Sequence, residues 1–275
     1  VYAAFFLYPA VELVVLSLQS WDGLGPREFV GLEQYSRLMS DRLFWLSLRH
    51  NLLWLLGATV VPVVAGLLLA LLLARSRMYG RVLFRTVFFL PQVLSSVTVA
   101  IIWGWIYNPT FGALNVTLNA LGLEFLQQRW LGDKSLVLPS LFIAWSWVHY
   151  GFTMVIFIAA IDGIDEIYFD AAKVDGANGW WRFWHIVLPF IRAPLTTVLL
   201  ITAIAAMQVF DLVFVLTNGG PARASLVIPL LMIDNAFIYS RVGYAAAIAV
   251  VLAAIILVFS ILFLYLRGVF RDEAA

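Results

Sequence analysis

Six long runs with almost no charged side chain constrain this chain more than any other feature of its sequence. The runs cover residues 1–20, 52–74, 86–107, 136–161, 193–216 and 244–266, and together they hold one glutamate, one aspartate and one histidine. An α-helix rises 1.5 Å per residue, so about 20 apolar residues cross the roughly 30 Å hydrocarbon core of a bilayer. The sequence therefore predicts an all-α membrane protein with six transmembrane helices, the first of them a span rather than a cleavable signal peptide.

The composition excludes several other classes of protein. Only 12% of the 275 residues are charged and 63% are hydrophobic, whereas about 25% of the residues in a soluble domain are charged. The net charge of +1 offers no basic face for nucleic acid. The absence of cysteine excludes a thiolate metal site and a cysteine nucleophile. We expect a single transmembrane domain over residues 1–275, with no metal site.

The positions of lysine and arginine predict the orientation in the membrane. The short link 75–85 holds four arginines and the tail holds two, and basic residues in short loops favour the cytoplasmic side. With six spans, both termini and the link 162–192 are then cytoplasmic, and the links 21–51, 108–135 and 217–243 are external. This topology puts nine basic residues inside and eight outside, so the total count does not decide the orientation. The prediction depends on the concentration of arginines in the short link 75–85.

The cytoplasmic link 162–192 predicts two short helices around a turn. Asp165 can cap the first helix, Asp175-Gly176 can end it, and the second helix runs from about residue 179 to residue 187. The small residues are Ala171, Ala172, Gly176 and Ala177, and the aromatic residues beside them are Phe169, Trp180, Trp181, Phe183 and Trp184. Small and aromatic residues together are typical of a surface that docks another protein. An amphipathic hairpin resting on lipid headgroups explains the tryptophans equally well.

The same link resembles a known family. Asp170-Ala171-Ala172, then Gly176, then Ile186-x-Leu188-Pro189 is similar in residue type and spacing to the Glu-Ala-Ala loop of permease subunits of binding-protein-dependent ABC importers. The departure is Asp170, where the family usually has glutamate. Further landmarks are Tyr8-Pro9, Phe84-Arg85, Leu90-Pro91, Gly112-x-x-Asn115, Phe210-Asp211 and Thr217-Asn-Gly-Gly-Pro221. The last motif is similar to maltose-type carbohydrate importers, in the subunit that pairs with a second, different permease.

The resemblance implies the type I ABC importer permease fold, in which cytoplasmic coupling helices sit in a cleft of an ATPase dimer. The residues it implies for this role are Asp170, Ala171, Ala172, Asp175, Gly176, Ala177 and Phe183. It also implies a second homologous permease, an external solute-binding protein, and a place in a bacterial or archaeal inner membrane. The chain itself has no phosphate-binding loop, and its only lysines are Lys134 and Lys173. We therefore expect a transport subunit without catalytic residues or a cofactor, with ATP and Mg²⁺ bound by the ATPase.

Polar groups within the predicted spans are candidates for the solute path, because such groups are costly in hydrocarbon. The candidates are Gln92, Trp145, His149, Gln208 and Asp211. Gln208 and Asp211 stand at i and i+3, so on an uninterrupted helix they share a face. Amide and carboxylate groups can bond sugar hydroxyls, and aromatic rings can cover the C–H faces of a sugar. Alternative roles are a link between two spans for His149 and a helix cap or ion pair for Asp211.

The sequence therefore predicts a permease subunit that forms half of the path for a mono-, di- or oligosaccharide. The alternative is an ABC permease for a phosphorylated polyol, an amino acid or a peptide. A secondary transporter would not need the link 162–192. An intramembrane hydrolase is disfavoured, because Ser146 and His149 lie on one predicted helix with no sign of an oxyanion site.

Overall fold

The computed structural model describes residues 1–74 and 79–267. Arg75, Arg77 and Arg271, three of the arginines that predict the orientation, lie outside the described residues. The α-helices are α1 Tyr8–Ser17, α2 Glu33–Ser40, α3 Arg42–Leu73, α4 Arg81–Phe89, α5 Ser96–Ile106, α6 Ala113–Ala120, α7 Val137–Asp162, α8 Glu166–Val174, α9 Gly179–Arg182, α10 Leu188–Phe190, α11 Arg192–Met207, α12 Asp211–Thr217, α13 Ile228–Ile233 and α14 Val242–Leu266. A two-residue antiparallel ladder pairs β1, Gln19–Ser20, with β2, Glu28–Phe29. The described residues are therefore predominantly helical.

Three helices are long and apolar enough to cross a membrane without interruption. They are α3, α7 and α14, with 32, 26 and 25 residues, and they contain the predicted spans 52–74, 136–161 and 244–266 almost completely. Helix α3 begins ten residues before its apolar run, because Asp41 caps it and accepts a hydrogen bond from the amide of Leu43 at 2.8 Å.

The other expected spans differ from continuous helices. A bend of 101° separates Arg81–Val93 from Ser96–Ile106, inside the expected span 86–107. It follows Pro91, and Ser95 starts the new helix by accepting a hydrogen bond from the amide of Thr98 at 3.2 Å. The expected span 193–216 is also broken, since α11 ends at Met207 and α12 starts at Asp211. A bend of 73° precedes α11.

The first expected span is the shortest. It consists of a π-helical turn, Ala3–Leu7, followed directly by α1, and the combined helix Ala3–Ser17 is shorter than the three long helices. It packs along α14. By length and composition, the described residues supply three spanning helices, or up to five when each bent pair counts as one span.

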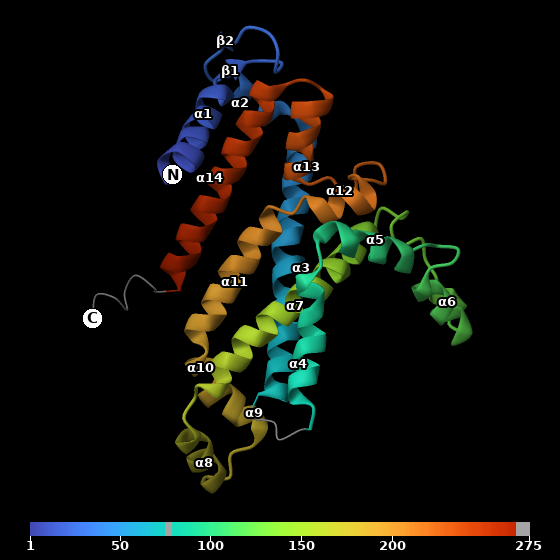
Figure 1. The fold of residues 1–275 in the computed structure, drawn as a ribbon, viewed down its shortest axis with the longest axis vertical. Helices are drawn as coiled ribbons and strands as arrows, with labels where there is room; N and C mark the ends of the chain where they lie inside the picture. Colours follow the sequence, from blue (N-terminus) through green and yellow to red (C-terminus); the bar gives the residue numbers. More distant parts are fainter. Residues whose placement is uncertain (75–78, 268–275) are drawn as a thin grey trace.

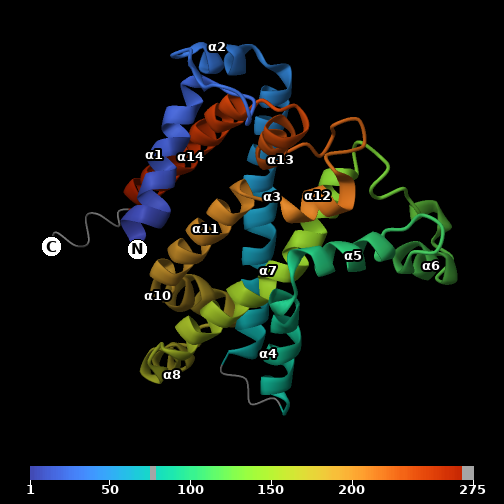
Figure 2. The same cartoon turned by 45° about the horizontal axis from the view of Figure 1, so that its top comes forward.

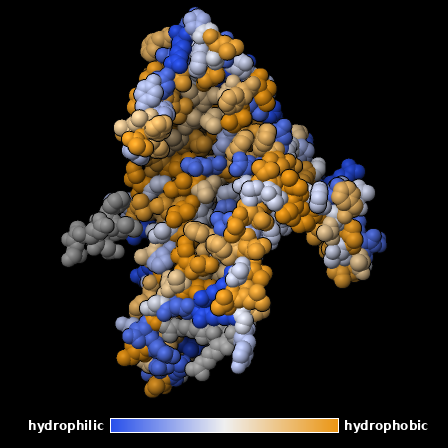
Figure 3. Space-filling view, viewed as in Figure 1, coloured by the Kyte–Doolittle hydropathy of each residue, from blue (hydrophilic) through white to orange (hydrophobic). Residues whose placement is uncertain are grey.

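The elements divide between two ends of the molecule (Figure 1). Helices α8 and α9 lie at one end beside the start of α4, whereas α2, the β ladder and α13 lie at the other. Helices α5 and α6 extend sideways in both ribbon views (Figures 1 and 2). Apolar residues cover much of the middle of the face in Figure 3, as a chain surrounded by lipid requires. Residues 79–85 and the link 162–192 thus share an end, as the predicted topology requires.

The close packing of α3 on α7 depends on Gly66. A Cβ added at Gly66 would lie 2.7 Å from the backbone nitrogen of Met154 and 2.8 Å from Cβ of Thr153. Thr153 Oγ1 donates a hydrogen bond to the carbonyl of Pro62 at 2.8 Å, so the two helices are tied where they touch. A larger residue has no free space there.

Gly66→Ala is therefore expected to destabilise the chain by about 1–3 kcal/mol, the usual range for overpacking. The matched control is Gly104→Ala on α5, where the nearest atom to the added Cβ is 3.6 Å away. Thermal unfolding of the detergent-solubilised protein measures the effect, at roughly 2–4 °C per kcal/mol. Equal unfolding temperatures for the two variants would contradict the prediction.

Candidate coupling hairpin and solute cavity

Local signals define both ends of α8. Asp165 Oδ1 accepts a hydrogen bond from an amide of the first turn at 3.0 Å, which satisfies one of the unpaired donors of a helix start. At the other end Gly176 adopts a φ of +71°. The amide of Gly176 donates to the Lys173 carbonyl at 3.1 Å, and that of Ala177 donates to the Ala172 carbonyl at 2.8 Å. This is a Schellman end, and it confirms that Asp175-Gly176 terminates the first helix.

The second helix of the hairpin also begins where the sequence predicts. Asn178 Oδ1 accepts a hydrogen bond from the amide of Trp181 at 2.8 Å and so caps α9. Helix α9 and the π-helical turn Phe183–Val187 cover the expected range 179–187. The helical path then continues through α10, where Pro189 occupies a first-turn position that needs no amide donor.

The seven residues proposed for ATPase coupling divide by exposure. Asp170, Ala171, Asp175 and Gly176 are exposed, Ala177 and Phe183 are half-buried, and Ala172 is buried. Ala177 and Phe183 pack against the apolar cluster that contains Ala172. Asp170 pairs with Lys173 at 2.7 Å, but both side chains are more than half exposed, so solvent weakens the pair. The exposed four are available to a partner, and the other three hold the hairpin against the rest of the chain.

Large apolar side chains surround the exposed residues of the hairpin. Val174 is 88% exposed and Trp180 is 71% exposed, and Ile167, Trp181 and Trp184 are also exposed. A short segment with this many exposed large apolar side chains is typical of an interaction site. It can be covered by a protein partner or by lipid headgroups, so the structure leaves both interpretations of the tryptophans open.

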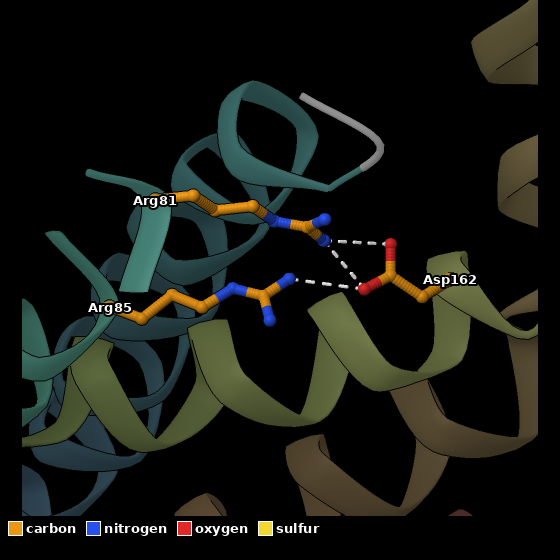
Figure 4. A network of polar contacts seen from close by, with 3 residues as sticks. All are labelled: Arg81, Arg85 and Asp162. Atoms are coloured by element: carbon orange, nitrogen blue, oxygen red, sulfur yellow. Dashed lines mark hydrogen bonds and ion pairs between the residues drawn. The ribbon is translucent and has the colours of Figure 1, made fainter. Parts of the chain in front are cut away.

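An ion-pair cluster fixes the base of the hairpin (Figure 4). Arg81 Nη2 on α4 lies 2.9 Å and 2.6 Å from the two carboxylate oxygens of Asp162, the last residue of α7. Arg85 Nη2 lies 3.0 Å from one of the same oxygens. Their side chains are 25–37% exposed, so each pair contributes on the order of 1 kcal/mol or less. The cluster ties the start of α4 to the end of α7, directly before the hairpin.

Four of the five solute-path candidates meet in one cavity. It has a volume of about 260 Å³ and lies between α5, α7, α11 and α12. Its described lining residues are Ser96, Val99, Trp145, Val148, His149, Ala205, Gln208, Val209, Phe210, Asp211 and Leu212. Aromatic, amide, imidazole and carboxylate groups therefore converge on one space. Ser96, another polar residue of the predicted third span, and Phe210 line it as well.

The break between α11 and α12 brings Gln208 and Asp211 to this cavity. The sequence predicts that they share a face of an uninterrupted helix, but the helix ends at Met207, and Asp211 starts the next one. They therefore do not share a face of one helix, but both side chains are exposed and line the cavity. Asp211 also lies in the first turn of α12, where the helix dipole favours a negative charge.

Trp145 and His149 occupy the cavity wall as a stacked pair. Their ring centroids are 3.9 Å apart with an interplanar angle of 16°. Trp145 Nε1 donates to the carbonyl of Ala58 on α3 at 3.1 Å, so the indole is held in place. His149 therefore covers one face of Trp145, and its Nδ1 lies 2.9 Å from the Trp145 carbonyl of the same helix.

Gln92 is the exception among the candidates. It lies in the 3-10 segment Leu90–Val93 before the sharp bend, is only half exposed, and does not line the cavity. Its Oε1 is buried without a hydrogen-bond partner among the described residues. Within the described part of the chain, no group of three or more His, Cys, Asp or Glu side chains is placed to hold a metal ion.

The landmark Gly112-x-x-Asn115 has a structural explanation. Asn115 is buried, and its Nδ2 donates to the carbonyls of Pro109 and Gln128 at 3.2 and 3.1 Å, while its Oδ1 accepts from Trp130 Nε1 at 2.8 Å. A Cβ at Gly112 would lie 2.5 Å from the Ile106 carbonyl oxygen. These two residues therefore shape the link 108–135.

The chain is similar to known transport proteins. Residues 63–270 match the family described as the binding-protein-dependent transport system inner membrane component. A probable ABC transporter permease protein of Pyrococcus horikoshii is 36% identical, with 95% of this chain and 89% of the relative covered. The alpha-glucoside transport system permease protein AglF of Rhizobium meliloti is also 36% identical, with 98% and 79% covered.

A solved structure shows the same fold. It is a chain of a bacterial alginate ABC transporter in complex with an alginate pentasaccharide-bound periplasmic protein, and it superposes with a TM-score of 0.81. The match covers 96% of this chain and 88% of that one, at 22% sequence identity. The likeness therefore extends over the bends as well as the long helices.

Proposed function

Because the chain belongs to the family of inner membrane components of binding-protein-dependent transport systems, we propose that it forms half of the translocation path for a sugar in an ATP-driven importer. The observation that carries this proposal is the meeting of Trp145, His149, Gln208 and Asp211 in one cavity at the break between α11 and α12. A ring pair beside amide and carboxylate acceptors suits a ligand with both C–H faces and hydroxyl groups.

The relatives support a carbohydrate rather than another solute. The alpha-glucoside permease of Rhizobium meliloti and a diacetylchitobiose permease of Streptomyces coelicolor, the latter 33% identical, are both named for saccharides. The Thr217-x-Gly-Gly-Pro221 motif resembles the same class. We extend to this chain the sugar class alone, and not any one of these saccharides.

The coupling hairpin would connect this subunit to the ATPase that drives transport. The exposed residues Asp170, Ala171, Asp175 and Gly176 would enter a cleft of a cytoplasmic ATPase dimer, which binds the ATP and Mg²⁺. Closure of that dimer would rock the spans between inward-open and outward-open states, and a second permease subunit would complete the path. Bistable interfaces suit such rigid-body changes. The four arginines of the link 75–85 support a cytoplasmic position for this end, and the proposal includes cytoplasmic termini and the six spans of the type I importer fold.

Reconstitution tests the proposal. The permease pair, its ATPase and its binding protein would be placed in liposomes, and uptake of labelled mono-, di- and oligosaccharides would be compared with that of amino acids, peptides and phosphorylated polyols. We expect ATP-dependent uptake of a saccharide. Uptake of one of the other solutes in its place would support the alternative class, and uptake driven by an ion gradient without ATP would exclude an ABC importer.

A further inference from the structure

Asn51 joins two broken helix ends that are far apart in the sequence. Its Nδ2 donates to the carbonyl of Met207 at 2.8 Å, and its Oδ1 accepts from the amide of Ile228 at 2.7 Å. Met207 is the last residue of α11 and Ile228 the first residue of α13. Groups at these positions lack partners within their own helices. All three residues are buried, so no solvent replaces the amide.

Only an amide fits this place among side chains of its size. The Met207 carbonyl requires a donor and the Ile228 amide requires an acceptor, and the asparagine side chain carries both at its end. Leucine has neither group. The adjacent His50 adds a third bond from α3, because its Nδ1 lies 2.8 Å from the carbonyl of Leu226.

The two bonded segments have different places in the molecule. Residues 208–211, directly after Met207, form the wall of the solute cavity. Residues 217–227, directly before Ile228, form the loop with the Gly-Gly-Pro turn, which Ser225 closes by donating to the Gly220 carbonyl at 2.6 Å. Helix α3 therefore connects the cavity wall to this loop through two consecutive side chains.

Two cavities adjoin the wall segment. Gln208 and Phe210 line the solute cavity and also a second space of about 310 Å³, which Pro229, Met232 and Ile233 of α13 and Leu252 of α14 complete. Side chains that line a cavity lack packing partners on that side, so a hydrogen bond contributes more to fixing the position of this segment. Asn51 supplies the bond at the point where the segment begins.

We propose that Asn51 is a positioning residue that holds the Gln208–Asp211 wall in register with the loop 217–227, so that the two move together during transport. The role in transport rests on the proposed function, but the register itself does not. Without the amide, the wall would take several positions and bound solute would meet Gln208 and Asp211 in the wrong place.

Two variants and one matched control test the proposal. Asn51→Leu removes both bonds at similar volume, and Asn51→Ala leaves room for water to pair with the two backbone groups. Ser47→Ala is the control, since Ser47 is equally buried on α3, one turn earlier, and bonds only to the carbonyl of Phe44 in its own helix. Uptake and ATP hydrolysis are measured per assembled complex, so a loss of folded protein does not count.

We expect both Asn51 variants to lower uptake roughly ten-fold or more per assembled complex, because neither variant keeps the hydrogen bonds from α3 to the two segments, and Asn51→Leu also leaves two buried backbone groups unpaired. ATP hydrolysis is expected to fall less, so the ratio of solute imported to ATP consumed drops. Ser47→Ala should keep both values. Unchanged uptake and an unchanged ratio in the Asn51 variants would overturn the proposal.

A second readout needs neither solute nor ATPase. The chain has no cysteine, so Gln208→Cys can report on the wall through its rate of reaction with a water-soluble thiol reagent. We expect the Asn51 variants to change this rate several-fold and Ser47→Ala to leave it unchanged. Equal rates would overturn the proposal even if sugar uptake were confirmed. The proposal would also be overturned if both Asn51 variants failed to assemble while Ser47→Ala assembled normally. The Asn51 amide would then serve folding alone.

Discussion

Ala171→Arg is expected to abolish ATP-driven uptake while leaving the chain folded in the membrane. Ala171 is exposed on α8 and is not part of the apolar cluster beneath the hairpin, so a long charged side chain there can extend into solvent. In a cleft of the ATPase it would prevent close approach. Loss of one hot-spot contact of about 2 kcal/mol corresponds to roughly 30-fold weaker coupling.

A substitution at the neighbouring residue Ala172 would test the coupling surface less clearly. Ala172 is 4% exposed and packs in the apolar cluster beneath the hairpin, so Ala172→Arg would damage the fold as well as the coupling surface. Ala171→Ser is the control at the tested position, because it stays small. ATPase stimulation by the binding protein, measured on purified complex, is the readout. Full stimulation of the Ala171→Arg complex would refute the coupling assignment.

Gly176 provides an independent variant on the same surface. No atom lies within 4 Å of a Cβ added there, but φ is +71°, a conformation that asparagine adopts more readily than other non-glycine residues. Gly176→Asn should therefore retain more coupling than Gly176→Asp, which adds a charge. Equal activity of the two would argue against a contact at this residue.

The hairpin was predictable almost residue by residue because its signals are local. Asp165, Asn178 and Gly176 each act on groups within a few residues of themselves, so their types and spacing determine where the helices start and end. The long helices α3, α7 and α14 were equally predictable from the sequence, since each contains one uninterrupted apolar run. Capping residues are sufficient to predict the short helices of the hairpin, and hydropathy is sufficient to predict the long helices, when no distant contact intervenes.

The breaks were not predictable from the same signals. Apart from Asp211, the residues on both sides of the Gln208–Phe210 break are uncharged and mostly apolar, so the run 193–216 is predicted to be one helix, although Met207 bonds to Asn51, 156 residues away. The bend near Ser95 is similar, because Pro91 is compatible with a kinked span as well as with a sharp turn. Gln92 was expected beside the other candidates, and this bend places it outside the cavity. Each candidate side chain could be identified from the sequence, but which of them line the same cavity depends on tertiary structure.

Asp211→Leu is expected to reduce solute uptake about 10- to 100-fold with little effect on folding. The carboxylate is exposed to the cavity, and a hydrogen bond from a sugar hydroxyl to a charged acceptor contributes about 1.5–3 kcal/mol. The fold loses only the favourable position of a negative charge at the start of α12, which is worth about 0.3–1 kcal/mol. Uptake should therefore fall much more than thermal stability does.

The comparison that decides this prediction uses Thr197→Ala as its control. Thr197 is exposed on α11, its Oγ1 bonds to the Ala193 carbonyl at 3.1 Å in its own helix, and it does not line the cavity. Gln208→Leu should resemble Asp211→Leu, since both remove a polar group from the same wall. If both cavity variants import solute at the rate of Thr197→Ala, with the same half-saturating concentration of loaded binding protein, the solute does not contact this wall. If uptake falls and ATP hydrolysis continues, the wall acts on the solute and not on the coupling hairpin, which lies at one end of the molecule.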